Sequence, residues 1–233
     1  VAKDFILRLP KEYQPLVNLG NSIAARRAYK YLKDVRNISD ELILKHKLGF
    51  CSSGDFANRI IIPSFDKNGN LNFFTSRDID PSSALPYVNA KDLPHGYKNT
   101  IIINEINVDF KQPVVIVEGY FDLFSSIDNT VALCGSSLNP ESYLFKTLVE
   151  NETDILLALD PDAFYKKSVP IAEMFMNYNL NVFNVDVRPY KDMGKMKKEE
   201  ALNRIKAAKL ITRQDIFKSK INKFNCFFWC LRL

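Results

Sequence analysis

The sequence predicts a mixed α/β protein, with a parallel sheet flanked by helices that follows a smaller α+β unit. After residue 113, short apolar runs alternate with helix-like segments, and such runs are typical of buried parallel strands. Before that point, two apolar runs flank Asn68-Gly69, which is a strong signal for a β-hairpin. We therefore expect an N-terminal unit over residues 1–112, an α/β unit over 113–211, and a basic and aromatic tail over 212–233.

Composition sets limits on the class of protein. The chain has 233 residues, of which 46% are hydrophobic, enough for the cores of one or two domains. The net charge of +5 is compatible with nucleic-acid binding but does not establish it. Four cysteines without a CxxC pair, and only two histidines, argue against a structural zinc site and a disulfide framework, so we expect a cytosolic protein. No apolar run has the length of a membrane span, so we expect no membrane contact.

The first unit shows helix caps and a hairpin. Ser22 and Ser39 are placed to cap two helices, and Asp40 and Glu41 suit the first turn of the second one. In chain order we expect helices at 22–35 and 39–49, hairpin strands at 60–62 and 71–74, a loop-rich stretch at 78–98, and a short strand at 100–103.

The second unit shows a strand–helix alternation. We expect strands at 114–118, 130–134, 154–159 and 181–187, and helices at about 120–128, after 139, and at about 165–178. Asn139 is placed to cap the middle helix, with Pro140 at its first position. This alternation implies parallel strands joined by right-handed crossovers.

Acidic side chains follow the predicted strands, and ligands of open parallel sheets bind beyond the carboxyl ends of the strands. The acids are Glu118, Asp122, Asp160, Asp162 and Asp192. An isolated Asp-x-Asp after a strand is usually a helix cap or a solvated turn. The joint pattern favours a metal site, because clustered acids repel one another unless a cation neutralises them. Oxygen ligands alone suit Mg²⁺, which points to phosphoryl-transfer chemistry.

Three motifs that follow successive predicted strands resemble those of a Toprim domain, which occurs in primases, topoisomerases and small nucleases. They are Glu118-Gly119-x-x-Asp122, Gly135-Ser136 and Asp160-x-Asp162. Upstream segments resemble DnaG-type DNA primases, especially those of bacteriophages: Tyr31-Leu32-x-x-Val35-Arg36-Asn37-Ile38-Ser39, Leu48-Gly49-Phe50, Arg59-Ile60-Ile61-Ile62-Pro63 with Asp66-x-x-Gly69, and Phe74-Thr75-Ser76-Arg77. The resemblance covers about residues 22–210 and implies a Toprim-type sheet after the α+β subdomain.

The chain departs from the primase pattern at three positions. Pro161 replaces the glycine of the Asp-Gly-Asp motif, and Pro86 replaces a lysine that would contact phosphate. Gly194 stands where a second aspartate is usual, which would leave the metal site one ligand short.

The resemblance implies a primase catalytic core, a nucleotidyltransferase that makes short RNA primers on single-stranded DNA from ribonucleoside triphosphates with Mg²⁺ or Mn²⁺. It also implies a replicative helicase as partner and a location in the cytoplasm of a bacterium or a phage-infected host. The implied catalytic residues are Glu118, Asp122, Asp160 and Asp162, and the implied metal ligands are Glu118, Asp160, Asp162 and Asp192. Glu118 is either a metal ligand or the general base.

The implied phosphate contacts are Gly135, Ser136, Arg188 and Lys191, and the implied template contacts are Arg59, Arg77, Tyr87 and Asn89. Solvated loop charges are the competing interpretation for the basic residues. Two other functions use the same motifs: a Toprim nuclease, and a degenerate module that binds single-stranded DNA or a helicase without catalysis.

Overall fold

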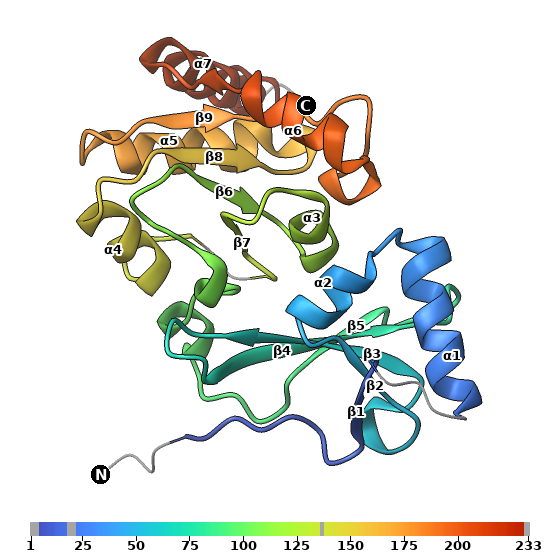
Figure 1. The fold of residues 1–233 in the computed structure, drawn as a ribbon. Helices are drawn as coiled ribbons and strands as arrows, with labels where there is room; N and C mark the ends of the chain where they lie inside the picture. The colour runs from blue at the N-terminus through green and yellow to red at the C-terminus, as the bar shows by residue number, and fades with distance from the viewer. Residues whose placement is uncertain (1–4, 18–21, 136–137, 231–233) are drawn as a thin grey trace. The chain divides into compact units, whose positions relative to one another are not determined.

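The computed structural model describes residues 5–17, 22–135 and 138–230. The chain divides into two compact units, residues 1–106 and 107–233 (Figure 1).

The first unit is built on an antiparallel sheet of five strands in the order β1-β2-β3-β4-β5. Their bounds are β1 Tyr13–Pro15, β2 Gly49–Cys51, β3 Arg59–Phe65, β4 Leu71–Asp78 and β5 Tyr87–Asn89. The predicted hairpin is confirmed as β3 and β4. Its turn is held by Asp66, whose carboxylate accepts the backbone N–H groups of Asn68 and Asn70, while Gly69 takes a φ of 84°.

Both predicted helices of this unit form and both predicted serine caps are confirmed, but the second helix ends at Lys45 rather than near Gly49, which begins β2. The Ser22 hydroxyl accepts the Ala25 N–H at the start of α1 (Ile23–Lys30), which continues into a π-helical turn over Tyr31–Val35. The Ser39 hydroxyl accepts the Leu42 N–H at the start of α2 (Asp40–Lys45). These bonds satisfy N–H groups that the first turn of a helix leaves unpaired.

The strand predicted at 100–103 is wrong, because side chains satisfy the backbone there in place of a neighbouring strand. The Asn72 amide donates to the Ile102 carbonyl at 2.8 Å, and the Ser64 hydroxyl accepts the Asn104 N–H at 2.9 Å. Ile102 and Ile103 are still buried. The apolar run therefore predicted burial correctly and strand pairing incorrectly.

The second unit contains the predicted parallel sheet. Its order is β10-β9-β8-β6-β7, with bounds β6 Val114–Val117, β7 Thr130–Ala132, β8 Ile155–Ala158, β9 Val182–Asn184 and β10 Lys209–Leu210. The strands β7, β6, β8 and β9 are mutually parallel, and β10 adds an antiparallel edge that the sequence did not indicate. Every residue of β6 and β7 is buried, as expected where helices cover a parallel sheet.

The helices of this unit are α3 Tyr120–Ser125, α4 Tyr143–Glu150, α5 Val169–Met176, α6 Lys198–Lys206 and α7 Arg213–Cys230 (Figure 1). The predicted cap of α4 at Asn139 is wrong. Ser142 caps that helix by accepting the Phe145 N–H, whereas Asn139 accepts the Glu141 N–H in the preceding turn. Within the described residues, no helix combines the length and hydropathy that a membrane span requires.

Candidate active site at the carboxyl ends of the parallel strands

Two of the predicted acidic motifs lie side by side because their strands are neighbours. Val117, the last residue of β6, pairs with Ala158, the last residue of β8. Glu118 follows the first strand, and Asp160 comes two residues after the second. The Asp160 N–H donates to Glu118 Oε1 at 3.4 Å. Asp162 is exposed in the short helical turn Pro161–Ala163 that follows.

The carboxylates at this edge destabilise one another's charge. The pKa of Asp160 is raised, first by burial and then by the negative charges of Glu118, Asp192 and Asp162. The ammonium group of Lys167 acts in the opposite direction. The edge therefore carries a concentration of negative charge that favours a bound cation.

Lys167 is a site residue that sequence reasoning missed. Its Nζ lies 2.9 Å from Glu118 Oε1 and 2.8 Å from Oε2. It comes from a π-helical turn, Phe164–Ser168, which joins the Asp160–Asp162 motif to α5. Such turns are often found at functional sites. The only sequence signal was a lysine pair a few residues after Asp162.

Asp122 holds two segments of backbone together. Its Oδ2 accepts the Gly119 N–H at the start of α3, and its Oδ1 accepts the Gly194 N–H, each at 2.9 Å. Burial raises the pKa of Asp122 to about 6, and the charges of Asp192 and Asp160 add to this rise, while the two N–H groups oppose it.

Gly194 makes this close approach possible. A Cβ atom there would lie 3.0 Å from Asp122 Oδ1 and 3.2 Å from the Phe121 backbone carbon. The residue that departs from the primase pattern thus brings the Asp192 segment against α3. Asp192 itself is half-buried just before the turn Met193–Lys195, and Lys191 is exposed beside it.

Arg188 is paired with an acid that sequence reasoning missed. Its Nε and Nη2 atoms lie 2.8 and 2.6 Å from the two carboxylate oxygens of Asp186, and this pairing lowers the pKa of Asp186 to about 2. The Arg188 side chain is 72% exposed, so the predicted contact with phosphate requires only an exchange of partners at the surface.

A pocket of about 410 Å³ lies between these motifs. Asp160 and Asp162 line one part of it, Asp186 and Arg188 another, and the rings of Phe164 and Tyr165 a third. Its volume is in the range of small-molecule sites.

The loop after β7 is tied to Glu118. The Cys134 N–H donates to the Glu118 carbonyl oxygen at 2.9 Å, and Cys134 and Gly135 both have positive φ, 46° and 79°. Gly135 is exposed, as its predicted contact with phosphate requires. The predicted contact at Ser136 lies outside the described residues.

The donor set fits a hard cation, although the described residues contain no group of three or more His, Cys, Asp or Glu side chains gathered as a metal site. Mg²⁺ is commonly held by one or two carboxylates, and waters and substrate phosphates complete its shell. Glu118 and Asp160 could supply such carboxylates, since the Asp160 backbone N–H reaches Glu118 and the charges of the two acids interact.

In the first unit, Arg59 is held inside the hairpin. Its Nη2 lies 3.2 Å from Asp78 Oδ2 and donates to the Leu85 carbonyl at 2.8 Å, and its side chain is 11% exposed. Its Nη1 is buried without a hydrogen-bond partner among the described atoms. These contacts give Arg59 a structural role, and its predicted contact with template stays a prediction.

Arg77 belongs to an arginine–tyrosine cluster, defined as Tyr31, Arg36, Arg77 and Tyr87. The Tyr31 hydroxyl accepts hydrogen bonds from Arg36 Nε at 2.8 Å and from Arg77 Nε at 3.1 Å. The Arg77 guanidinium also lies 4.8 Å from the centre of the Tyr87 ring, which is 45% exposed. Asn89 is exposed on the same strand, β5.

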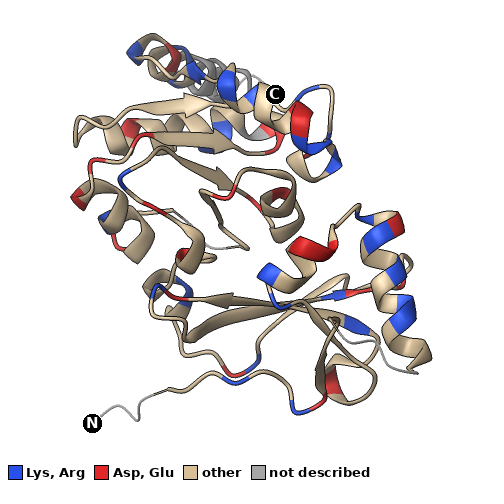
Figure 2. Cartoon of the chain, in the orientation of Figure 1, with Lys and Arg blue, Asp and Glu red and all other residues tan. Residues whose placement is uncertain are grey.

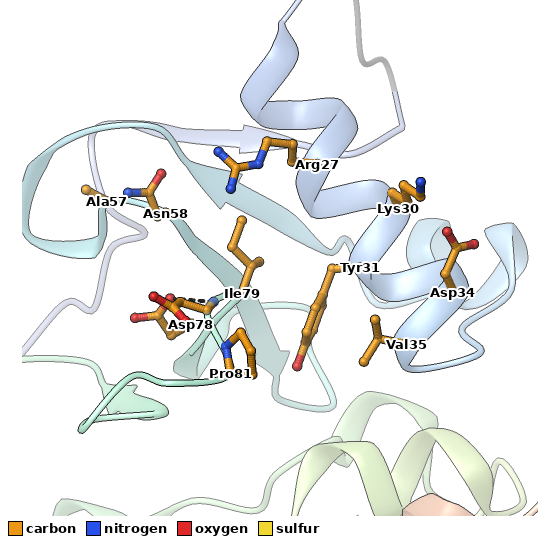
Figure 3. A pocket seen from close by; sticks show the side chains of 11 residues that line it. Arg27, Lys30, Tyr31, Asp34, Val35, Ala57, Asn58, Asp78, Ile79 and Pro81 are labelled. Atoms are coloured by element: carbon orange, nitrogen blue, oxygen red, sulfur yellow. Dashed lines mark hydrogen bonds between the residues drawn. The ribbon is translucent and has the colours of Figure 1, made fainter.

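A hollow of about 720 Å³ adjoins this cluster (Figure 3). Tyr31 and Val35 line it from one side, and Asp78, Ile79 and Pro81 face them from the end of β4. Lys and Arg residues lie along α1 (Figure 2), two of which, Arg27 and Lys30, line the hollow. Lys33, by contrast, is paired with Asp40 at 3.1 Å.

Comparison with known proteins relates this chain to primases. No family model matches it. It is 32% identical over 151 residues to a DNA primase of Mycoplasma genitalium, an alignment covering 60% of this chain and 24% of that protein. It is 24% identical over 221 residues to a DNA primase of Thermotoga maritima, covering 88% of this chain and 38% of that protein. The chain thus spans well under half the length of these relatives.

The fold agrees with these matches. A DnaG primase catalytic domain bound to single-stranded DNA superimposes with a TM-score of 0.68 at 19% identity, covering 82% of this chain and 74% of that one. The Escherichia coli primase catalytic core gives 0.69 at 18% identity, covering 90% and 80%. The chain therefore has an α/β fold consistent with the Toprim type. More particularly, it has the fold of DnaG primase catalytic cores and is similar in sequence to DNA primases.

Proposed function

We propose that this chain is the catalytic core of a DNA primase, which joins ribonucleoside triphosphates into short RNA primers on single-stranded DNA. The observation that carries the proposal is the placement of Glu118 beside Asp160 at one edge of the sheet. Asp160 and Asp162 both line the pocket at this edge. That edge belongs to a chain whose relatives are named DNA primases and whose fold is that of primase catalytic cores.

The reaction joins a primer 3′-hydroxyl to the α-phosphate of the incoming nucleotide and releases pyrophosphate. Catalysis of such a transfer consists mainly of positioning and of stabilising the charge that develops on oxygen. The pocket beside Asp160 and Asp162 would take the nucleotide, and the aromatic rings of Phe164 and Tyr165 would pack against it. Arg188 and Lys191 would contact the triphosphate once Arg188 leaves Asp186.

Glu118, Asp160 and Asp162 would hold Mg²⁺ or Mn²⁺, with Asp192 contributing charge from the neighbouring loop. When bound, the metal would neutralise the charge that builds on the phosphate oxygens. Asp122 acts differently, because both of its oxygens accept backbone N–H groups. It is a positioning residue that holds the Asp192 segment against α3.

The arginine–tyrosine cluster would bind the template backbone. Arg77 presents a cation beside an exposed aromatic ring, a combination that suits single-stranded DNA. A single-stranded template is also consistent with the DNA-bound primase domain whose fold this chain shares. A replicative helicase remains a partner that we propose from the resemblance alone.

One assay separates this proposal from the nuclease that shares its motifs. The protein is incubated with single-stranded DNA, Mg²⁺ or Mn²⁺, and labelled ribonucleotides, with and without a short annealed RNA primer. Incorporation of label into a growing strand is expected. Strand cleavage without incorporation would support a nuclease, and DNA binding that is independent of metal, with neither activity, would support a non-catalytic module.

A further inference from the structure

We propose that Lys167 occupies the cation position on Glu118 in the metal-free protein, so that a divalent metal ion must displace its ammonium group to bind that carboxylate. The inference rests on the proposed function, since it concerns the metal that the acidic edge would hold. It assigns to Lys167 a role in setting metal affinity.

The contact engages both oxygens of the carboxylate. Lys167 Nζ lies 2.9 Å from Oε1 and 2.8 Å from Oε2, and the Asp160 N–H also reaches Oε1. Mg²⁺ binds carboxylate oxygen at about 2.0–2.1 Å. An ammonium group and a dication placed against the same two oxygens would repel each other strongly at that separation. Because Lys167 contacts both oxygens, a metal ion that binds either one meets the ammonium group and is expected to displace it.

Displacing Lys167 costs little free energy, because the Lys167–Glu118 ion pair lies at the surface. The side chains of Lys167 and Glu118 are 53% and 30% exposed, and exposed ion pairs contribute little to stability. The flexible lysine stem lets the ammonium group move into solvent. Lys167 therefore lowers the affinity for metal without preventing binding, and it neutralises part of the acidic edge while metal is absent.

The chain supplies a matched control next to it. Lys166 is also exposed in the same π-helical turn and carries the same charge. Among the described residues, Glu118 is paired with Lys167 and not with Lys166. Removing either lysine changes the net charge equally, but only one change releases Glu118.

The test is direct titration of Mn²⁺ into the purified protein, followed by electron paramagnetic resonance of free Mn²⁺. This readout does not depend on primer synthesis. We expect Lys167→Ala to bind Mn²⁺ about three- to fivefold more tightly than wild type, a factor set by the contribution of an exposed ion pair. Lys166→Ala should keep the wild-type affinity, and Lys167→Arg, whose guanidinium can also bind both oxygens, should not exceed it. In a Glu118→Gln background the effect of Lys167→Ala should vanish.

Equal affinities for wild type and Lys167→Ala would overturn this inference and leave the proposed metal site intact. Weaker binding by Lys167→Ala would overturn it as well, since Lys167 would then be ordering Glu118 for the metal. Mn²⁺ binding that does not respond to Glu118→Gln would overturn both the inference and the assignment of Glu118 as a ligand.

Discussion

Each unit of this chain contains an arginine–aspartate pair, and the two pairs differ in burial. In the hairpin of the first unit, Arg59 and Asp78 have side chains that are 11% and 16% exposed. At the sheet edge of the second unit, Arg188 and Asp186 are 72% and 47% exposed. A pair largely shielded from solvent exchanges partners at a higher cost in free energy than an exposed pair does. The difference in exposure therefore separates an arginine that stabilises the hairpin from one that is accessible for the proposed contact with phosphate.

The same contrast extends to the acids around each pair. Asp78 is balanced by a cation that faces it across the hairpin register. At the sheet edge, the pKa values of Asp122 and Asp160 are both raised, first by burial and then by neighbouring carboxylates. The Arg59–Asp78 pair therefore stabilises the hairpin, whereas the sheet edge of the second unit tolerates mutual repulsion where a cation is expected.

The largest expected effect comes from breaking the less exposed pair, Arg59–Asp78. Arg59→Ala leaves the Asp78 carboxylate without its cation and should lower the free energy of unfolding by about 3 kcal/mol. Urea denaturation measures this loss. Arg188→Ala breaks the exposed pair and should leave the urea concentration at the unfolding midpoint nearly unchanged. If the two variants lose equal stability, the difference in exposure does not decide how much each ion pair stabilises the fold.

A smaller loss is expected from Gly194→Ala. The added methyl group would press against Asp122 Oδ1 and the backbone of α3, and we expect a cost of about 2 kcal/mol, typical of overpacking. The neighbouring exposed change Lys195→Ala serves as control and should stay within about 0.5 kcal/mol of wild type. A neutral Gly194→Ala would show that the loop moves away from α3 easily.

Asp122 should make stability depend on pH. Its pKa is about 6 in the folded chain against an ordinary value of 3.8, so protonation favours folding. The contribution is fully present below pH 4 and is lost as the pH rises through 6. Between pH 7.5 and 5 wild type should gain about 1.4 kcal/mol relative to Asp122→Asn, which does not titrate. Urea denaturation in the presence of a chelator at both pH values measures the difference in free energy of unfolding between the two proteins. A difference that does not change with pH would refute the raised pKa of Asp122.

The smallest effect on stability, and a specific effect on binding, is expected at Arg77. Arg77→Ala should reduce the slope of log affinity against log salt for single-stranded DNA by about one unit. Lys91→Ala, which removes an exposed cation paired with Asp55, should leave the slope unchanged. Fluorescence anisotropy over a range of salt concentrations measures both. An unchanged slope for Arg77→Ala would make the arginine–tyrosine cluster purely structural.

The sequence predicted the parallel sheet because its strands are buried on both faces and therefore read as uninterrupted apolar runs. It predicted the neighbouring positions of Glu118 and Asp160 for the same reason, since residues that follow adjacent parallel strands share one edge. It failed at 100–103, where the Asn72 side chain bonds to the Ile102 carbonyl, and at Asn139, which accepts the Glu141 N–H while Ser142 caps the helix. Propensity does not predict such side-chain contacts with the backbone.

The contacts of the basic side chains were the least predictable part of the site. Lys167 reaches Glu118 across 49 residues of sequence, and its position depends on a π-helical turn that no sequence periodicity marks. From the sequence, Arg59 and Arg77 are both expected to be surface cations on the hairpin. Only the packed structure shows that one is paired with a mostly shielded acid and the other faces an exposed tyrosine.

The most direct test of the central claim changes one carboxylate at each end of β8. Asp160 follows β8 at the edge of the sheet where the acids gather. Asp154 precedes β8 at the other end, and its carboxylate accepts a hydrogen bond from the Asn181 amide at 3.0 Å. We predict that Asp160→Asn lowers ribonucleotide incorporation on a primed single-stranded template by at least about 100-fold, the scale for loss of transition-state charge stabilisation. Asp154→Asn should retain near wild-type incorporation. Near-normal synthesis by Asp160→Asn would contradict the placement of catalysis at this edge of the sheet.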